Sequence, residues 1–142
     1  MSGTKKKFFK TKPLTEQNVN AILYVLYIDL EDKRLVKIGV TRRAIEDRVV
    51  EILGSIFVSY RVFPFCKPKR FQRTPDAFEK EKMLHDYFSS CRYECGSSFS
   101  GSTEMFYDVD TEHLLDIYAR VVAGEDVSGS KYVKEDISIS PV

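Results

Sequence analysis

The stretch from Tyr24 to Arg48 constrains the fold more than any other part of the sequence. Residues 21–29, AILYVLYID, are apolar at both alternating sets of positions, which is typical of a strand that is covered on both faces and central in its sheet. A charged turn at residues 31–34 and a second strand at residues 35–41 follow, and residues 44–53 repeat apolar side chains at helical spacing. The pattern predicts an antiparallel hairpin with a helix packed against it.

Three polar side chains interrupt this pattern: Tyr27, Lys37 and Arg48. A turn centred on Asp32, with an odd-length loop, places Tyr27 directly opposite Lys37 and on the same face of the hairpin. An ammonium beside a phenol stabilises the phenolate, and such a pair suits proton abstraction from water. Arg48 lies at the edge of the apolar stripe of the helix. Its side chain either packs by its stem and reaches solvent, or matches the charge of a phosphate with two parallel hydrogen bonds.

Further segments follow the first helix. In order, we expect a third strand over residues 56–65 that ends near Pro64, a basic loop over 66–73, a helix over 74–89 opened by Thr74 and Pro75, a polar loop over 91–103, a short strand over 104–109 and a last amphipathic helix capped by Asp110 or Thr111. Strands and helices in this order predict a single α/β (α+β) domain.

Glu81 stands near the middle of the apolar stripe of the helix over 74–89. A carboxylate in such a place is costly unless it is paired or binds a cation. Two readings therefore stay open: a salt bridge to Arg48 or to a lysine at the rim, and a ligand for Mg²⁺, which often takes only one or two protein carboxylates. His85 lies one turn later on the same face, either as a packed core histidine or as a group that orients a metal-bound water.

Composition excludes some classes of protein. The net charge is only +1, but five lysines and no acid lie in the first twelve residues, and a second basic run contains Lys67, Lys69, Arg70 and Arg73. Either run is a solvated segment or attracts a polyanion. The sequence contains no run of about eighteen apolar residues, so no membrane span is predicted. Three cysteines without a secretory signal favour reduced thiols and a cytoplasmic location, in a bacterium or its host, and their spacing does not predict a zinc site.

We expect three parts along the chain: a basic flexible arm over residues 1–18, a folded domain over 19–123 and a polar tail over 124–142.

The order Tyr27, Lys37-Ile38-Gly39, Arg48 and a glutamate on a helix resembles the GIY-YIG nuclease superfamily. Val25-Leu26-Tyr27 is similar to the first half-motif, with Val25 in place of the leading glycine. Lys37-Ile38-Gly39 is similar to the second half-motif in the phage-type branch with a KIG variant. Further matches to that branch, over roughly residues 22–108, are Glu81, Leu84, His85, Phe88, Gly101, Glu104 and Phe106. The late asparagine of many members has no clear counterpart; Glu104 lies near that region.

The resemblance implies a small three-stranded, mainly antiparallel sheet flanked by helices. It also implies a metal-dependent endonuclease in which Tyr27 is the base that activates water, Lys37 tunes or positions Tyr27, Arg48 holds the phosphate and stabilises the transition state, and Glu81 binds one Mg²⁺ or Mn²⁺. DNA is expected as substrate ahead of RNA, and a homodimer or a partner would be needed for strong sequence specificity. Backbone phosphates are expected to contact Arg42, Arg43, Lys67, Lys69, Arg70 and Arg73. The alternative is a catalytically inactive module of the same fold that binds nucleic acid or protein.

Overall fold

The computed structural model describes residues 20–133. Four strands form one antiparallel sheet in the order β3-β1-β2-β4, so β1 is central as its two apolar faces predicted. The elements are β1 (Ala21–Leu30), β2 (Lys33–Thr41), α2 (Ile45–Tyr60), β3 (Cys66–Thr74), α3 (Ala77–Tyr87), η1 (Ser89–Cys91), η2 (Ser102–Glu104), β4 (Met105–Tyr107) and α4 (Thr111–Val122). The α+β class is confirmed, whereas the expected three-stranded sheet has a fourth strand because β4 pairs with β2.

The β1–β2 hairpin differs from the prediction by one residue. Its turn contains only Glu31 and Asp32, whose φ angles of 56° and 62° are those of a two-residue primed turn. Leu30 therefore pairs with Lys33, Leu26 with Lys37 and Tyr27 with Val36. The predicted pairing of Tyr27 with Lys37 is wrong, and a slip of one residue moves a side chain to the other face of the sheet.

Two further segments differ from the expected order. Helix α2 continues through Tyr60, so the strand expected over residues 56–65 does not form. The expected basic loop over residues 66–73 is instead the edge strand β3, which accommodates Pro68 because an edge strand leaves one row of backbone groups unpaired. Thr74 ends β3, and α3 begins at Ala77 without a side-chain cap. In α4, by contrast, the Asp110 side chain accepts hydrogen bonds from the amides of Glu112 and His113, as expected of a cap.

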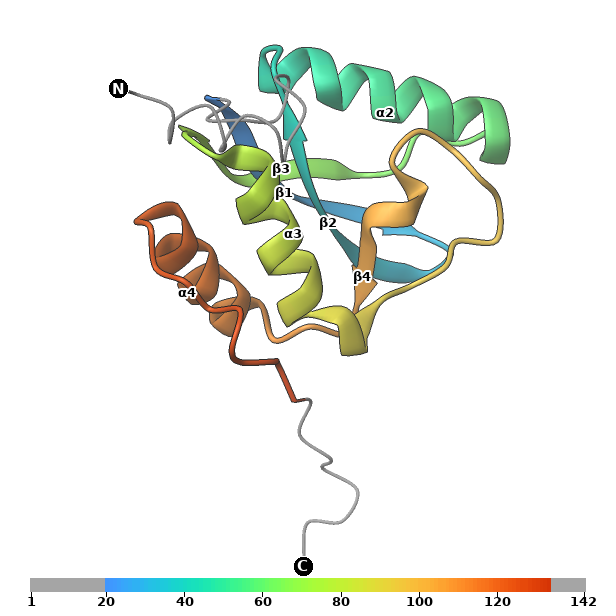
Figure 1. Ribbon diagram of the computed structural model, residues 1–142. Helices are drawn as coiled ribbons and strands as arrows, with labels where there is room; N and C mark the ends of the chain where they lie inside the picture. The colour runs from blue at the N-terminus through green and yellow to red at the C-terminus, as the bar shows by residue number, and fades with distance from the viewer. Residues whose placement is uncertain (1–19, 134–142) are drawn as a thin grey trace, which may run out of the picture.

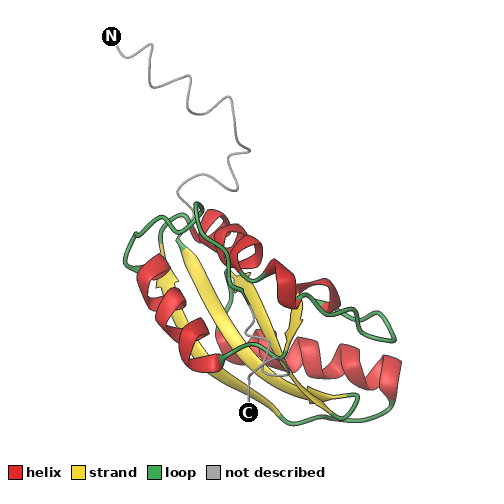
Figure 2. Cartoon of the chain, turned by 90° about the horizontal axis from the view of Figure 1, so that it is seen from below, coloured by secondary structure: helices red, strands yellow, loops and turns green. Residues whose placement is uncertain are grey.

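Helices cover both faces of the sheet (Figures 1 and 2). Helix α2 packs on one face, where the buried side chains include Tyr24, Leu26, Ile52 and Ile56. Helices α3 and α4 pack on the opposite face, against a core that includes Leu23, Val25, Ile38, Leu84 and Phe106. Strand β4 has only three residues and pairs with Leu35, Val36 and Lys37 of β2. The rest of β2, from Ile38 to its end at Thr41, is not paired by β4.

The packed domain continues beyond residue 123, where the tail was expected to begin. Val127 is buried in the same core cluster as residues of α3 and α4, and the Tyr132 amide donates a hydrogen bond of 2.8 Å to the Tyr87 carbonyl. The expected basic arm over 1–18 and the end of the tail lie outside the described residues. None of the helices within residues 20–133 is long and apolar enough to cross a membrane.

Candidate active site

Lys37 is the centre of a cluster of polar side chains at the β2–β4 edge. Its side chain is 0% exposed, and its ammonium forms an ion pair with the carboxylate of Glu104, which lies at the end of η2 just before β4. The Nζ atom also lies 5.4 Å from the centroid of the Tyr24 ring. Lys37 and Tyr24 share a face because Leu26 pairs with Lys37 and Tyr24 pairs with Gly39. A buried ammonium is thus compensated by a carboxylate and an aromatic ring.

Arg48 connects helix α2 to this cluster. Its Nε donates a hydrogen bond of 3.0 Å to the Tyr24 hydroxyl, and its Nη1 donates to the Ser100 Oγ, also at 3.0 Å. The same Nη1 lies 2.6 Å from a carboxylate oxygen of Glu51 on the exposed side of the helix. Burial lowers the pKa of Arg48, but the bonds to Tyr24 and Glu51 outweigh it and raise that pKa, so the guanidinium stays charged.

Two glycines allow the backbone to lie close over these side chains. A Cβ added to Gly39 would lie 2.5 Å from the Tyr24 hydroxyl oxygen. A Cβ added to Gly101 would lie 2.4 Å from Lys37 Cε and 3.2 Å from Arg48 Nη2. Gly101 also has a φ of 85°, a conformation that L residues with a side chain rarely adopt. The segment at Ser100 and Gly101 therefore covers Lys37 and Arg48 directly.

Glu81 reaches the same cluster from α3, on the other side of the sheet edge. Its side chain is 16% exposed. Burial raises the pKa of Glu81 to about 7, and the charge of Glu104, together with a hydrogen bond between the two carboxyls, adds to the effect. Lys37 and Arg48 act in the opposite direction. A salt bridge from Glu81 to Arg48 or to a lysine was one of the two expectations. Arg48 and Lys37 both lower the pKa of Glu81, but the group hydrogen-bonded to it is a second carboxyl, that of Glu104.

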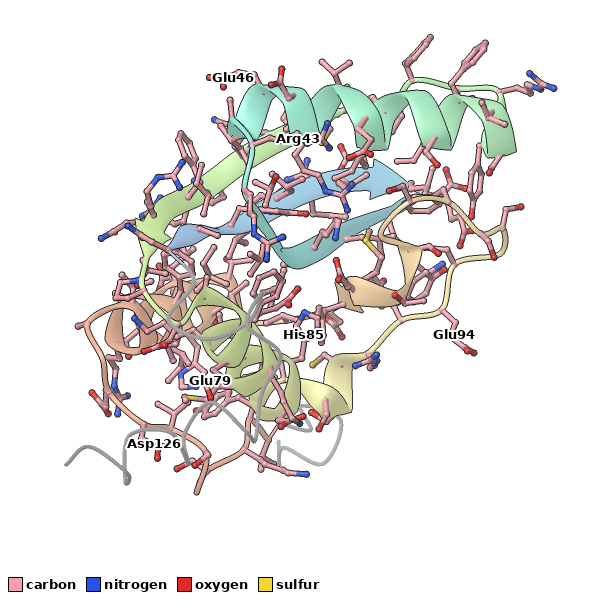
Figure 3. All side chains as sticks on the ribbon, turned by 45° about the horizontal axis from the view of Figure 1, so that its top comes forward. Arg43, Glu46, Glu79, His85, Glu94 and Asp126 are labelled. Atoms are coloured by element: carbon pink, nitrogen blue, oxygen red, sulfur yellow. The ribbon has the colours of Figure 1, made fainter. Side chains whose placement is uncertain are left out.

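His85 lies one turn after Glu81 on α3 and points toward the β2–β4 edge (Figure 3). Its Nε2 is 2.8 Å from the carbonyl oxygen of Ile38, which lies just beyond the last residue of β2 that β4 pairs. A carbonyl only accepts, so Nε2 carries the proton. The ring also packs edge-on against Phe106 at 5.3 Å, and burial lowers the pKa of His85. The nearest Glu81 oxygen is 3.9 Å from Nε2, so the geometry favours the packed-histidine reading over an orienting role.

Tyr27 does not join this cluster. It pairs with Val36 in β2 and Lys67 in β3, and it lies on the face of the sheet opposite to Lys37 and Tyr24. The phenol near Lys37 and Arg48 is that of Tyr24. Strand β1 contains the pattern of two apolar residues followed by tyrosine twice, as Ile22-Leu23-Tyr24 and Val25-Leu26-Tyr27, and only the register of the hairpin distinguishes them.

The cations expected to contact nucleic acid lie in two groups. Arg42 and Arg43 are exposed between β2 and α2, where Arg43 pairs with Glu51 and the Arg42 guanidinium lies 5.2 Å from the Phe78 ring centroid. The other four, Lys67, Lys69, Arg70 and Arg73, belong to edge strand β3. Strands β1 and β2 separate this second group from the β2–β4 edge.

The donor set at the edge fits one hard divalent cation. Glu81 and Glu104 are adjacent carboxyls, and a cation between oxygen ligands of this kind would relieve their repulsion. Within residues 20–133 no group of three or more His, Cys, Asp or Glu side chains is arranged to hold a metal. A cation here would therefore have two carboxylates from this part of the chain and take its other ligands from water or substrate, which is common for Mg²⁺.

Comparison of the chain with known proteins identifies one matching family. No curated protein and no solved structure matches the chain. The family model of the T5orf172 domain matches residues 21–122, which include all four strands, the three described α-helices and every residue of the β2–β4 edge cluster. The chain therefore belongs to the T5orf172 domain family.

Proposed function

We propose that the protein is a metal-dependent endonuclease that hydrolyses phosphodiester bonds of nucleic acid, DNA ahead of RNA. The observation that carries this proposal is the convergence of a phenol, a guanidinium and two adjacent carboxyls around the buried Lys37. Glu104 already pairs with Lys37, and Arg48 pairs with Glu51, so Glu81 is a further carboxyl beside Glu104 that raises the cost of burial. Family membership and the resemblance to GIY-YIG nucleases support the same activity.

In this proposal Tyr24 takes the role that the resemblance assigned to Tyr27. The Tyr24 hydroxyl first loses its proton to solvent, and the phenolate then takes a proton from the water that attacks the phosphorus. The bond to the leaving oxygen breaks, and that oxygen takes a proton from solvent. The two cations near Tyr24, Arg48 at 3.0 Å and Lys37 beside the ring, stabilise negative charge on the phenol oxygen. Arg48 also provides the guanidinium that stabilises charge on the non-bridging phosphate oxygens.

We infer that Glu81, with Glu104 beside it, holds one Mg²⁺ or Mn²⁺. A bound divalent cation supplies Lewis-acid stabilisation of the charge that develops on the phosphate and the leaving oxygen. In the proposed site Lys37 keeps Glu104 in place through their ion pair and so holds the second carboxylate next to Glu81. Backbone phosphates of the substrate are proposed to contact Arg42 and Arg43, which adjoin α2, as well as the cations of β3.

One observation favours the alternative of an inactive binding module. Tyr24 and Lys37 are both 0% exposed, and the segment at Ser100 and Gly101 lies over Lys37 and over Arg48, the hydrogen-bond partner of Tyr24. Substrate reaches these groups only if that segment moves away from Lys37 and Arg48. A module that only binds would keep it in place.

Nicking of supercoiled plasmid DNA in Mg²⁺ or Mn²⁺ tests the proposal. We expect the wild-type protein to nick and Glu81→Gln to lose the activity, whereas Glu94→Gln, a change at an exposed acid in the polar loop (Figure 3), retains it. Absence of cleavage of both DNA and RNA by the wild-type protein would favour the binding module.

A further inference from the structure

A second group of aromatic and basic side chains lies on the sheet face that carries Tyr27. Lys67 pairs directly with Tyr27, and the Phe65 carbonyl accepts a hydrogen bond from the Asp29 amide, so both β3-side residues share this face. Arg34 pairs with Asp29 from β2 and lies on the same face. We name these residues, with Lys69 and Arg70, the β3 strip: Tyr27, Arg34, Phe65, Lys67, Lys69 and Arg70.

The side chains of the β3 strip stack cations on aromatic rings. The Arg34 guanidinium lies 5.3 Å from the Phe65 ring centroid and 5.8 Å from that of Tyr27. The Lys69 ammonium lies 5.7 Å from the Tyr27 ring centroid. Lys69 has this position because the register of β3 shifts between Val25 and Leu26, and a bulge changes the direction of a side chain. Phe65 remains 52% exposed.

The charged residues of the β3 strip are all basic, and one acid, Asp29, lies next to the strip. Asp29 pairs with Arg34. Residues 61–75 contain five basic and no acidic residues, RVFPFCKPKRFQRTP. Among residues 20–133 no ion pair engages Lys67, Lys69 or Arg70, and no strand pairs with the outer edge of β3. An exposed ring beside Arg34, on a strip whose other three cations have no ion pair in this part of the chain, fits a polyanion that also has flat apolar faces.

We propose that the β3 strip is a docking surface for single-stranded nucleic acid, with an unpaired base stacked on Phe65 and backbone phosphates against Lys67, Lys69 and Arg70. The inference rests on the proposed function and makes its substrate more specific: a nucleic acid with an unpaired segment. A base offers its face to Phe65 only when it is free of its neighbours, so a fully paired duplex uses the cations but not the ring.

A second copy of the chain fits the strip less well. Antiparallel pairing of two β3 strands at their free edges would place the cations of one copy against those of the other. Like charges directly opposed are destabilising in a sheet. Nucleic acid supplies the opposite charge along the whole strand.

The test is fluorescence anisotropy with a labelled single-stranded oligonucleotide and the duplex of the same sequence, in EDTA so that no cleavage occurs. We expect tighter binding of the single strand, and Phe65→Ala to weaken it roughly 5- to 150-fold. Phe65→Leu, which keeps apolar bulk but lacks the ring, should also weaken it. Lys67→Ala should weaken both ligands and lower the slope of log affinity against log salt by about 1.

Phe63→Ala is the matched control, because Phe63 is 67% exposed but stacks on Phe57 of α2 outside the strip. Equal effects of Phe63→Ala and Phe65→Ala, or equal wild-type affinity for single strand and duplex, would overturn the inference. A Phe65-dependent dimer in sedimentation without nucleic-acid binding would overturn it in favour of a second copy. Because binding is measured without metal, a negative nicking result with intact single-strand binding rejects only the nuclease proposal.

Discussion

The Nε of Arg48 donates a hydrogen bond of 3.0 Å to the hydroxyl of Tyr24, across 24 residues of sequence. This contact joins α2 to the central strand and holds the phenol beside Lys37. It also selects Tyr24 rather than Tyr27 as the tyrosine of the candidate site.

Replacement of Tyr24 by phenylalanine should lower the nicking rate by about 10² to 10⁴, the usual contribution of a general base. The measurement compares initial rates of Tyr24→Phe, Tyr27→Phe and Tyr107→Phe, the last removing a hydroxyl from an exposed ring in β4. Circular dichroism establishes that each variant is folded. A larger loss for Tyr27→Phe than for Tyr24→Phe would contradict the assignment.

Removal of one partner of the Lys37–Glu104 ion pair should have unequal effects on stability. Glu104→Gln leaves a fully buried ammonium without its carboxylate and should cost about 3 kcal/mol in the free energy of unfolding. Lys37→Met leaves only a carboxylate whose side chain is 31% exposed, so it should cost less. Urea unfolding measures both, and the double variant should be more stable than Glu104→Gln alone. The prediction fails if Glu104→Gln is neutral.

Stability should fall as pH rises toward neutrality because of Glu81. Its pKa is raised to about 7 in the folded protein from an ordinary value near 4.5, so between these values the folded state binds more protons than the unfolded state. The contribution is most unfavourable above pH 7, by at most about 3 kcal/mol. Glu81→Gln should remove this dependence and stabilise the protein at pH 8. Parallel pH profiles of unfolding for the two proteins would contradict the raised pKa.

Divalent cations should stabilise the folded protein at pH 8 through the same carboxyls. A cation that binds only the folded state raises the free energy of unfolding by about 2.7 kcal/mol at a concentration one hundred times its Kd. Thermal unfolding with and without Mg²⁺ or Mn²⁺ measures the effect, which should be lost in Glu81→Gln and retained in Glu94→Gln. Equal stabilisation of all three proteins would mean that the cation binds elsewhere.

Gly101→Ala should destabilise the protein by two separable effects. The φ of 85° costs a residue with a Cβ about 1–2 kcal/mol, and the added methyl would overlap Lys37. Gly124→Ala has the first effect alone, because its φ is 101° but no atom lies within 4 Å of the added Cβ. Gly129→Ala has neither effect. Urea unfolding should therefore show the largest loss of unfolding free energy for Gly101→Ala, a smaller one for Gly124→Ala and the smallest for Gly129→Ala. Equal losses for the first two would show that the segment at Ser100 and Gly101 shifts to accommodate the added methyl at little cost.

Much of the architecture follows from local patterns in the sequence. Two-faced apolar character predicts the central strand β1, helical spacing predicts the start of α2 and most of α3, and Asp110 predicts the start of α4. Strand β3 is missed because its exposed basic residues have the composition of a loop. Its strand conformation comes from pairing with β1, in which the partners are 38 (Ile28 and Cys66) to 53 (Ala21 and Thr74) residues apart in sequence.

The sequence by itself determined that a lysine, an arginine and a glutamate occupy positions where packing alone favours apolar residues, namely Lys37, Arg48 and Glu81. The tertiary structure decided which phenol and which second carboxyl join them. Glu31 and Asp32 form a two-residue turn without the asparagine or glycine that announces one, and this turn places Tyr24 rather than Tyr27 beside Lys37. The pairing of β4 with β2 places Glu104, the residue before β4, within ion-pair distance of Lys37. Side-chain alternation has a period of two, so a single residue of register, which no local pattern specifies here, determines the composition of the site.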